Sequence, residues 1–161
     1  MPATKKPRKK YRPKHVLLNP VAYVTESVKP LVEHDSYVLD WKLKNNAAFG
    51  ALLRAEATHA DLNTLVAARN VTEALVVTLK GVDIDSTLTR SAMALIDICA
   101  RANAGKGTAM KAPEIQAMRD LMQFHDALLD VVTVQQFETA LAYAKKEINA
   151  GRADRLKGTK A

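Results

Sequence analysis

His125 and Asp126 are the first residues of this 161-residue sequence to suggest chemistry, because adjacent imidazole and carboxylate groups can bind a metal ion. A hydrolytic metal site would need further His and Asp ligands on other helices. The remaining candidates are His34, Asp35, His59 and Asp130. They follow no recognisable order, and His125 shares an apolar stripe with Leu128 and Leu129. We therefore expect His125 to be a buried or half-buried core residue that makes one hydrogen bond.

Three other motifs also fall short of a complete active site. Glu56 and His59 have the Glu-x-x-His spacing of di-iron helical bundles, but such a site needs a second pair and two further Glu residues. Residues 105–108, Gly-Lys-Gly-Thr, lack the upstream Gly and the strand of a phosphate-binding loop, so we expect a helix connector there. Cys99 lies in an apolar helical segment and is expected to be a small buried residue. The chain is therefore predicted to be non-enzymatic, without a metal or a cofactor.

The elements that would position these residues are helices. Ala and Leu are plentiful and aromatic residues make up 5% of the sequence, a balance that favours helices over a β-sandwich. Apolar residues recur at helical spacing between residues that favour helix starts and stops. The predicted helices cover residues 19–30, 35–57, 58–81, 85–104, 113–129 and 133–151. The predicted fold class is all-α, a single-domain bundle of five or six helices.

Short sequence signals indicate how these helices begin and which of them pair. Thr58-x-x-Asp61 resembles a capping box with Asp in the last position, and Thr133-x-x-Gln136 is a closer match to that motif. The last two predicted helices are separated by a short connection. We therefore expect them to form a helical hairpin.

The range 35–57 is the least regular of the predicted helices. Asn45, Asn46 and Gly50 lie in its middle and weaken the helical pattern, so a break there is compatible with the sequence. Trp41 is expected to be a core anchor, because large aromatic side chains serve mainly in packing. The apolar surface of this range is expected to come from Val38, Trp41, Leu43, Phe49, Leu52 and Leu53.

The composition also limits the cellular setting. A single cysteine rules out an intrachain disulfide, which suits a reducing compartment. We find no secretory signal and no apolar run of membrane-spanning length. We therefore expect a soluble, cytoplasmic protein that does not associate with a membrane.

Positive charge is concentrated at the start of the chain. Residues 1–18 contain seven Lys or Arg, three prolines and no acidic residue, so this arm carries +7. Residues 151–161 carry +3, and since the whole chain carries +7, residues 19–150 carry −3. The arm lacks apolar periodicity, so we expect it to be flexible and disordered when free. The predicted organisation is a basic arm (1–18), a helical bundle (19–150) and a basic tail (151–161).

Such an arm is suited to binding nucleic acid. Lys and Arg at this density neutralise phosphates and release counterions, and Tyr11 could stack on an unpaired base. If all seven charges met duplex phosphates, the logarithm of affinity would fall with log salt at a slope of about −6. The helices show no sharp recognition motif, so sequence-specific binding is not expected. The predicted nucleic-acid-binding residues are Lys5, Lys6, Arg8, Lys9, Lys10, Tyr11, Arg12 and Lys14.

Four segments of the sequence resemble an uncharacterised family of small basic α-helical proteins encoded by bacteriophages and prophages. They are Lys-Lys-Tyr-Arg-Pro-Lys at 9–14, Asn-Pro at 19–20, His-Asp-Ser-Tyr at 34–37 and Asn-Val-Thr-Glu-Ala-Leu at 70–75. The likeness covers most of the chain and includes no catalytic motif. It implies a phage-associated setting inside a bacterial host cell.

Two functions from different classes follow from these observations. The first is a non-enzymatic, phage-related protein that is tethered to the phosphate backbone of DNA or RNA through its basic arm. The alternative is a phage-encoded inhibitor or adaptor that binds a host protein or nucleoprotein, such as a host defence complex. Homo-oligomer formation through long apolar stripes is compatible with either function. The arm could also be a solvated tail that aids solubility.

Overall fold

The computed structural model describes residues 28–31, 35–79 and 85–151. Within these ranges the chain forms five α-helices and no β-strand, which confirms the predicted all-α bundle. The basic arm 1–18 and residues 152–161 lie outside the described residues, as does the predicted helix 19–30 except for its last residues, 28–30, which are not helical. The helices are α2 (Asp35–Leu53), α3 (His59–Leu79), α4 (Asp85–Asn103), α5 (Ala112–Val131) and α6 (Val134–Asn149).

The predicted capping signals set two of the helix starts. At α3, the Thr58 N–H donates to Asp61 Oδ2 at 2.8 Å and the Asp61 N–H donates to Thr58 Oγ1 at 3.3 Å. At α6, Thr133 and Gln136 form the same reciprocal pair, with N–H to side-chain oxygen distances of 2.9 and 3.3 Å. Each pair satisfies backbone N–H groups that have no partner inside the helix.

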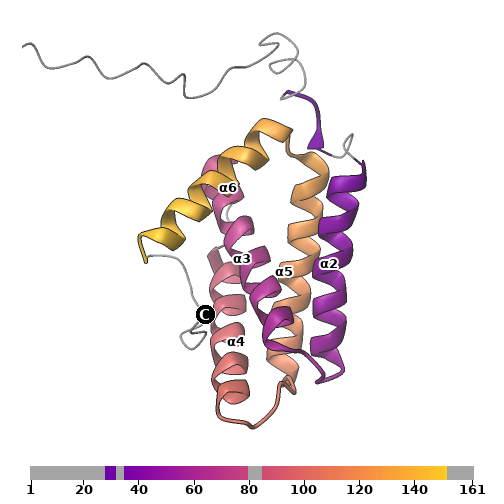
Figure 1. Ribbon diagram of the computed structural model, residues 1–161, viewed down its shortest axis with the longest axis vertical. Helices are drawn as coiled ribbons and strands as arrows, with labels where there is room; N and C mark the ends of the chain where they lie inside the picture. Colours follow the sequence, from indigo (N-terminus) through magenta and orange to yellow (C-terminus); the bar gives the residue numbers. More distant parts are fainter. Residues whose placement is uncertain (1–27, 32–34, 80–84, 152–161) are drawn as a thin grey trace, which may run out of the picture.

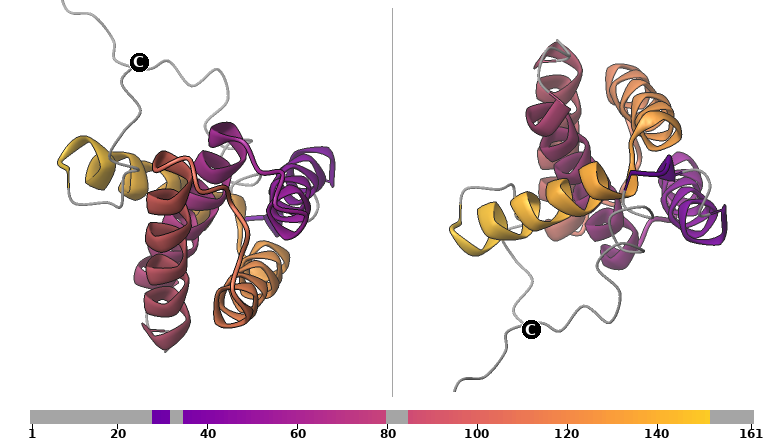
Figure 2. Two further views of the ribbon diagram at one scale, coloured as in Figure 1. Left: turned by 90° about the horizontal axis from the view of Figure 1, so that it is seen from below. Right: turned by 90° about the horizontal axis from the view of Figure 1, so that it is seen from above.

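The helices run along the long axis of the molecule, with one exception (Figure 1). Helices α2, α3, α4 and α5 lie side by side, whereas α6 leaves the end of α5 and crosses the bundle (Figures 1 and 2). Helix α6 packs most extensively against α3. The expected hairpin of the last two helices is therefore wrong in its pairing, because the apolar face of α6 is buried on α3. None of the described helices is long and apolar enough to cross a membrane.

Two hydrophobic clusters form the core, one toward each end of the bundle. The first joins α2, α3, α5 and α6 around Leu75, Leu129 and Phe137. Trp41 packs against this cluster, with its ring edge-to-face with Phe137 at a centroid distance of 5.5 Å, which fits the expected role as an anchor. The second joins α2, α3, α4 and α5 around Leu65, Ile98 and Leu121.

Candidate functional site

The eight predicted nucleic-acid-binding residues, Lys5 to Lys14, lie outside the described residues. The structure does describe where the chain that follows them reaches the bundle. Leu31 is buried, and its N–H donates to Val132 O at 2.7 Å. The Val134 N–H donates to Lys29 O at 3.1 Å. Residues 29–31 are thus fixed to the turn between α5 and α6, and the chain enters the bundle at that end.

His125 is fully buried and has a hydrogen-bond partner at each ring nitrogen. Nδ1 lies 2.8 Å from Thr72 Oγ1 on α3, and Nε2 lies 3.1 Å from Asn45 Nδ2 on α2. The Thr72 hydroxyl donates to Ala68 O at 2.8 Å, so its oxygen accepts from His125 Nδ1–H. Nε2 then accepts from the Asn45 amide. This assignment gives both ring nitrogens of a neutral His125 a hydrogen bond.

The surroundings of His125 strongly favour its neutral form. The pKa of His125 is lowered to about 4, mainly by burial; Asp126 opposes the shift and Lys42 adds to it. Along α2 and α5, Asn45 and His125 lie between residues of the two hydrophobic clusters, whereas Thr72 lies among the α3 residues of the first cluster. His125 is therefore a core residue, as expected, but with two hydrogen bonds instead of one.

Two further polar pairs join α2 to α5 beside the Asn45–His125 hydrogen bond. Lys42 Nζ donates to Asp130 Oδ1, and Asn46 Nδ2 donates to Asp126 Oδ2 at 3.2 Å. The two pairs are one helical turn apart on antiparallel helices. Asp126, the neighbour of His125 in the candidate metal motif, is thus engaged with α2. In the described part of the chain, no group of three His, Cys, Asp or Glu side chains is arranged to hold a metal ion.

The Glu56–His59 motif and the Gly-Lys-Gly-Thr segment lie together at the end of the bundle opposite the α5–α6 turn. The α2–α3 and α4–α5 connections border an open groove of about 480 Å³, whose lining includes Glu56, His59, Gly105, Gly107 and Thr108. No signal in the sequence indicates that these motifs lie together, because they come from separate connections. Glu56 accepts a hydrogen bond from Arg54 Nε at 2.9 Å. Both side chains of that pair are exposed, as is His59.

The Gly-Lys-Gly-Thr segment is a helix connector, as expected. Gly105 and Gly107 have φ values of 69° and 77°, which favour glycine. An ion pair beside the segment fixes its shape: Arg101 Nη1 and Nη2 donate to Glu114 Oε1 and Oε2 at 2.8 and 2.7 Å. Arg101 Nη2 also donates to Ala109 O at 3.0 Å. These contacts join the end of α4 to the start of α5 and account for the glycines without a bound phosphate.

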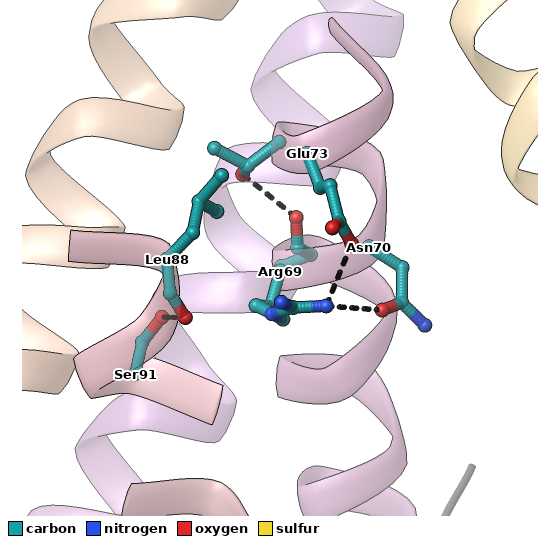
Figure 3. Close-up of polar contacts among 7 residues, drawn as sticks. Arg69, Asn70, Glu73, Leu88 and Ser91 are labelled. Carbon is teal, nitrogen blue, oxygen red and sulfur yellow. Dashed lines mark hydrogen bonds and ion pairs between the residues drawn. The ribbon is translucent and has the colours of Figure 1, made fainter. Parts of the chain in front are cut away.

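The helical body pairs many of its charges internally. Arg69, which is 8% exposed, donates from Nη1 to Glu73 Oε2 at 2.7 Å and to Asn70 Oδ1 at 3.3 Å (Figure 3). Ser91 of α4 donates to Leu88 O at 3.0 Å (Figure 3). Further ion pairs join Lys42 to Asp130, Arg54 to Glu56, Arg90 to Asp120 and Arg101 to Glu114. Each of these ion pairs neutralises a carboxylate of the body with a cation of the body.

One surface feature was missed by the sequence reasoning. Leu39, Leu43 and Leu53 of α2 are 54%, 58% and 47% exposed, although Leu43 and Leu53 were expected to add to the packed surface of this helix. Val38, Ala48 and Leu52 fill the buried face of α2 instead. The signal was present in the sequence, because two sets of apolar residues at helical spacing cannot both face one core.

Cys99 is buried, as expected, and burial raises the pKa of its thiol to about 11. The thiolate that would act as a nucleophile is therefore disfavoured.

Comparison with known proteins identified no matching protein family, no similar curated protein and no similar solved structure.

Proposed function

We propose that the protein is a non-enzymatic, phage-related nucleic-acid-associated protein that is held on the phosphate backbone of DNA or RNA through residues 5–14. The observation that carries this proposal is the segregation of charge. Residues 1–18 carry +7 and residues 19–150 carry −3. A polyanion attracts the first segment and gains nothing from the net charge of the second.

The ion pairs of the body support this division of charge. Glu73, Glu114 and Asp130 each pair with a cation of the body, at Arg69, Arg101 and Lys42. Carboxylates engaged in this way compete poorly with phosphates for the cations of residues 5–14. The proposal also fits the resemblance to small basic phage and prophage proteins, which implies a setting inside a bacterial host cell.

The alternative is a phage-encoded inhibitor or adaptor that binds a host protein. Exposed apolar side chains on two helices favour this alternative: Leu39 and Leu43 on α2, and Met93 and Ile96 on α4. Exposed apolar patches on a small protein are typical of protein–protein contacts. This function needs no basic arm, so the two candidates differ in which residues they require.

Affinity purification with and without nuclease separates the two candidates. The bait would be the full chain and a full-length variant in which the seven Lys and Arg residues of the arm are replaced by Gln. We expect nucleic acid to co-purify with the natural chain and to be lost with the variant, because the arm supplies the phosphate contacts. A stoichiometric protein partner that survives both nuclease and the arm substitutions would contradict the proposal and support the alternative.

A further inference from the structure

The outer face of α2 has the pattern of a helix that packs against another helix. Its residues follow alternating steps of four and three: Leu39, Leu43, Asn46, Gly50 and Leu53. This is the spacing of a coiled-coil seam. Asn46 lies at the border of this face, because its Nδ2 also donates to Asp126 Oδ2 of α5. The three leucines are about half exposed, and α2 lies at the outer edge of the molecule in all three views (Figures 1 and 2). The three leucines of the seam are therefore accessible to a partner.

Gly50 gives an independent indication of close helix packing. A glycine inside a helix costs up to about 1 kcal/mol relative to alanine, so it usually has a packing reason. The bundle itself supplies no such reason, because a Cβ at Gly50 would meet only the Arg54 Nη1 atom, at 3.4 Å, at the end of a flexible side chain. A second helix that approaches the backbone at Gly50 would supply one.

The charges beside the seam select the partner and its direction. Asp40, Ala47 and Arg54 are exposed and follow one another at intervals of seven residues on one flank of the seam. A second α2 in antiparallel orientation, related by a two-fold axis at Ala47, places Asp40 opposite the partner copy's Arg54 and the reverse. In a parallel pair these residues would be about 21 Å apart along the axis. Only the antiparallel pair gives two attractive contacts and a small residue at the axis.

We propose that α2 is a homodimer interface, in which the leucine seams of two copies pack in antiparallel orientation about Ala47. The Arg54–Glu56 pair is not an obstacle, because both side chains are more than 60% exposed and such pairs contribute little. The contact involves one helix from each copy, so it is small, and we expect a dissociation constant in the range of about 1–100 µM. The interface uses no residue of the arm and does not depend on the proposed function.

Sedimentation equilibrium of the full chain, from about 1 to 500 µM, measures this association. Leu43→Gln is expected to raise the dissociation constant at least tenfold, since each dimer buries two copies of the residue. Ile96→Gln is a matched control, because Ile96 on α4 is 57% exposed and Leu43 is 58% exposed. A monomer throughout the range would overturn the proposal. So would an association that Ile96→Gln weakens and Leu43→Gln does not.

Charge reversal tests the orientation. Asp40→Arg and Arg54→Asp should each raise the dissociation constant, because each variant places like charges opposite each other. A mixture of the two variants should associate at least as tightly as the natural chain, since every Arg then faces an Asp. Failure of the mixture to associate would overturn the antiparallel arrangement.

A cross-link tests the position of the axis. Ala47→Cys should form an intermolecular disulfide under mild oxidation, because the two copies of residue 47 meet at the two-fold axis. Ala100→Cys, at an exposed alanine on α4, is the matched control and should form no disulfide-linked dimer. Equal cross-linking of the two variants would contradict the proposed interface.

Discussion

Helices α2 and α5 lie side by side and each buries one partner of the Asn45–His125 hydrogen bond, but their outer faces differ. Helix α5 buries Leu121, Leu128 and Leu129 and leaves a polar face toward solvent, as an amphipathic helix does. Helix α2 buries Asn45 against His125 and leaves leucines exposed on its far side. The surface of α5 is explained by the fold of one chain, whereas the surface of α2 is only partly explained by it. The difference locates the part of the bundle that is suited to a further contact.

Leucine truncation on the two helices should show the largest difference. Leu121→Ala removes a fully buried side chain and is expected to lower the free energy of unfolding by about 2–5 kcal/mol. Leu43→Ala removes an exposed side chain and should cost less than about 0.5 kcal/mol. Urea denaturation at low micromolar concentration, where the chain is mainly monomeric, measures both. Similar costs at the two positions would show that the outer leucines belong to the fold of the single chain.

The polar layer between the two helices should make stability depend on pH. The pKa of His125 is about 4 in the folded state and near 6.5 when the residue is exposed, so the unfolded state binds the proton more readily. The stabilisation from neutral His125 is therefore complete above about pH 6.5 and is lost as pH falls toward 4. The loss should reach about 3 kcal/mol. Urea unfolding at several pH values between 4 and 7 measures this effect.

A matched control for the pH effect is His59, the other histidine in the part of the chain that the structure describes. His59→Gln should leave the dependence between pH 4 and 7 unchanged, because His59 is exposed. His125→Leu should remove most of it and also lower stability at pH 7, because Asn45 and Thr72 lose a buried partner. If His125→Leu keeps the natural pH dependence, another group is responsible for it.

The residues that follow α2 and α5 differ in backbone conformation. A substitution in the turn after α2 should have the smallest of the predicted effects on stability. Helix α5 is followed by Val132 in an extended conformation, whereas the turn after α2 places Ala55 at a φ of 59°. A residue with a side chain is strained in that conformation, so Ala55→Gly should stabilise the protein by about 0.5–1 kcal/mol. Ala100→Gly in α4 should destabilise it by a similar amount. Thermal unfolding of the two variants should therefore shift in opposite directions; a shift in the same direction would contradict the strain at Ala55.

Much of the fold could be predicted from the sequence because its signals are local. Thr58, Thr133 and Pro113 mark helix starts, and the structure begins three helices next to them. Apolar spacing located all five described helices to within a few residues. The partner of α6 could not be predicted in this way, since a short connection allows either a hairpin or a turn onto another helix. Only the packing of Phe137 beside Trp41 and Leu75 shows which one occurs.

The candidate sites were less predictable, because they depend on contacts between distant residues. His125 was recognised as a core residue from its apolar neighbours, but its partners Asn45 and Thr72 are 80 and 53 positions away in sequence. Asn45 was interpreted as a weak point of its helix, whereas it is buried in the core as a hydrogen-bond donor. Leu43 and Leu53, which are exposed, were expected to contribute to the apolar surface of α2 together with its buried residues. In each case the sequence gives the residue type and the fold decides which face it occupies.

The salt dependence of nucleic-acid binding tests the proposed function most directly. The account predicts that the logarithm of the affinity of the full chain for a DNA duplex falls with log salt at a slope of about −6. Replacing the seven Lys and Arg residues of the arm by Gln should bring the slope close to zero. Replacing four exposed body cations, Lys44, Lys106, Arg119 and Lys145, by Gln should change it by less than about 1. A slope that survives the arm substitutions and disappears with the body substitutions would contradict the account.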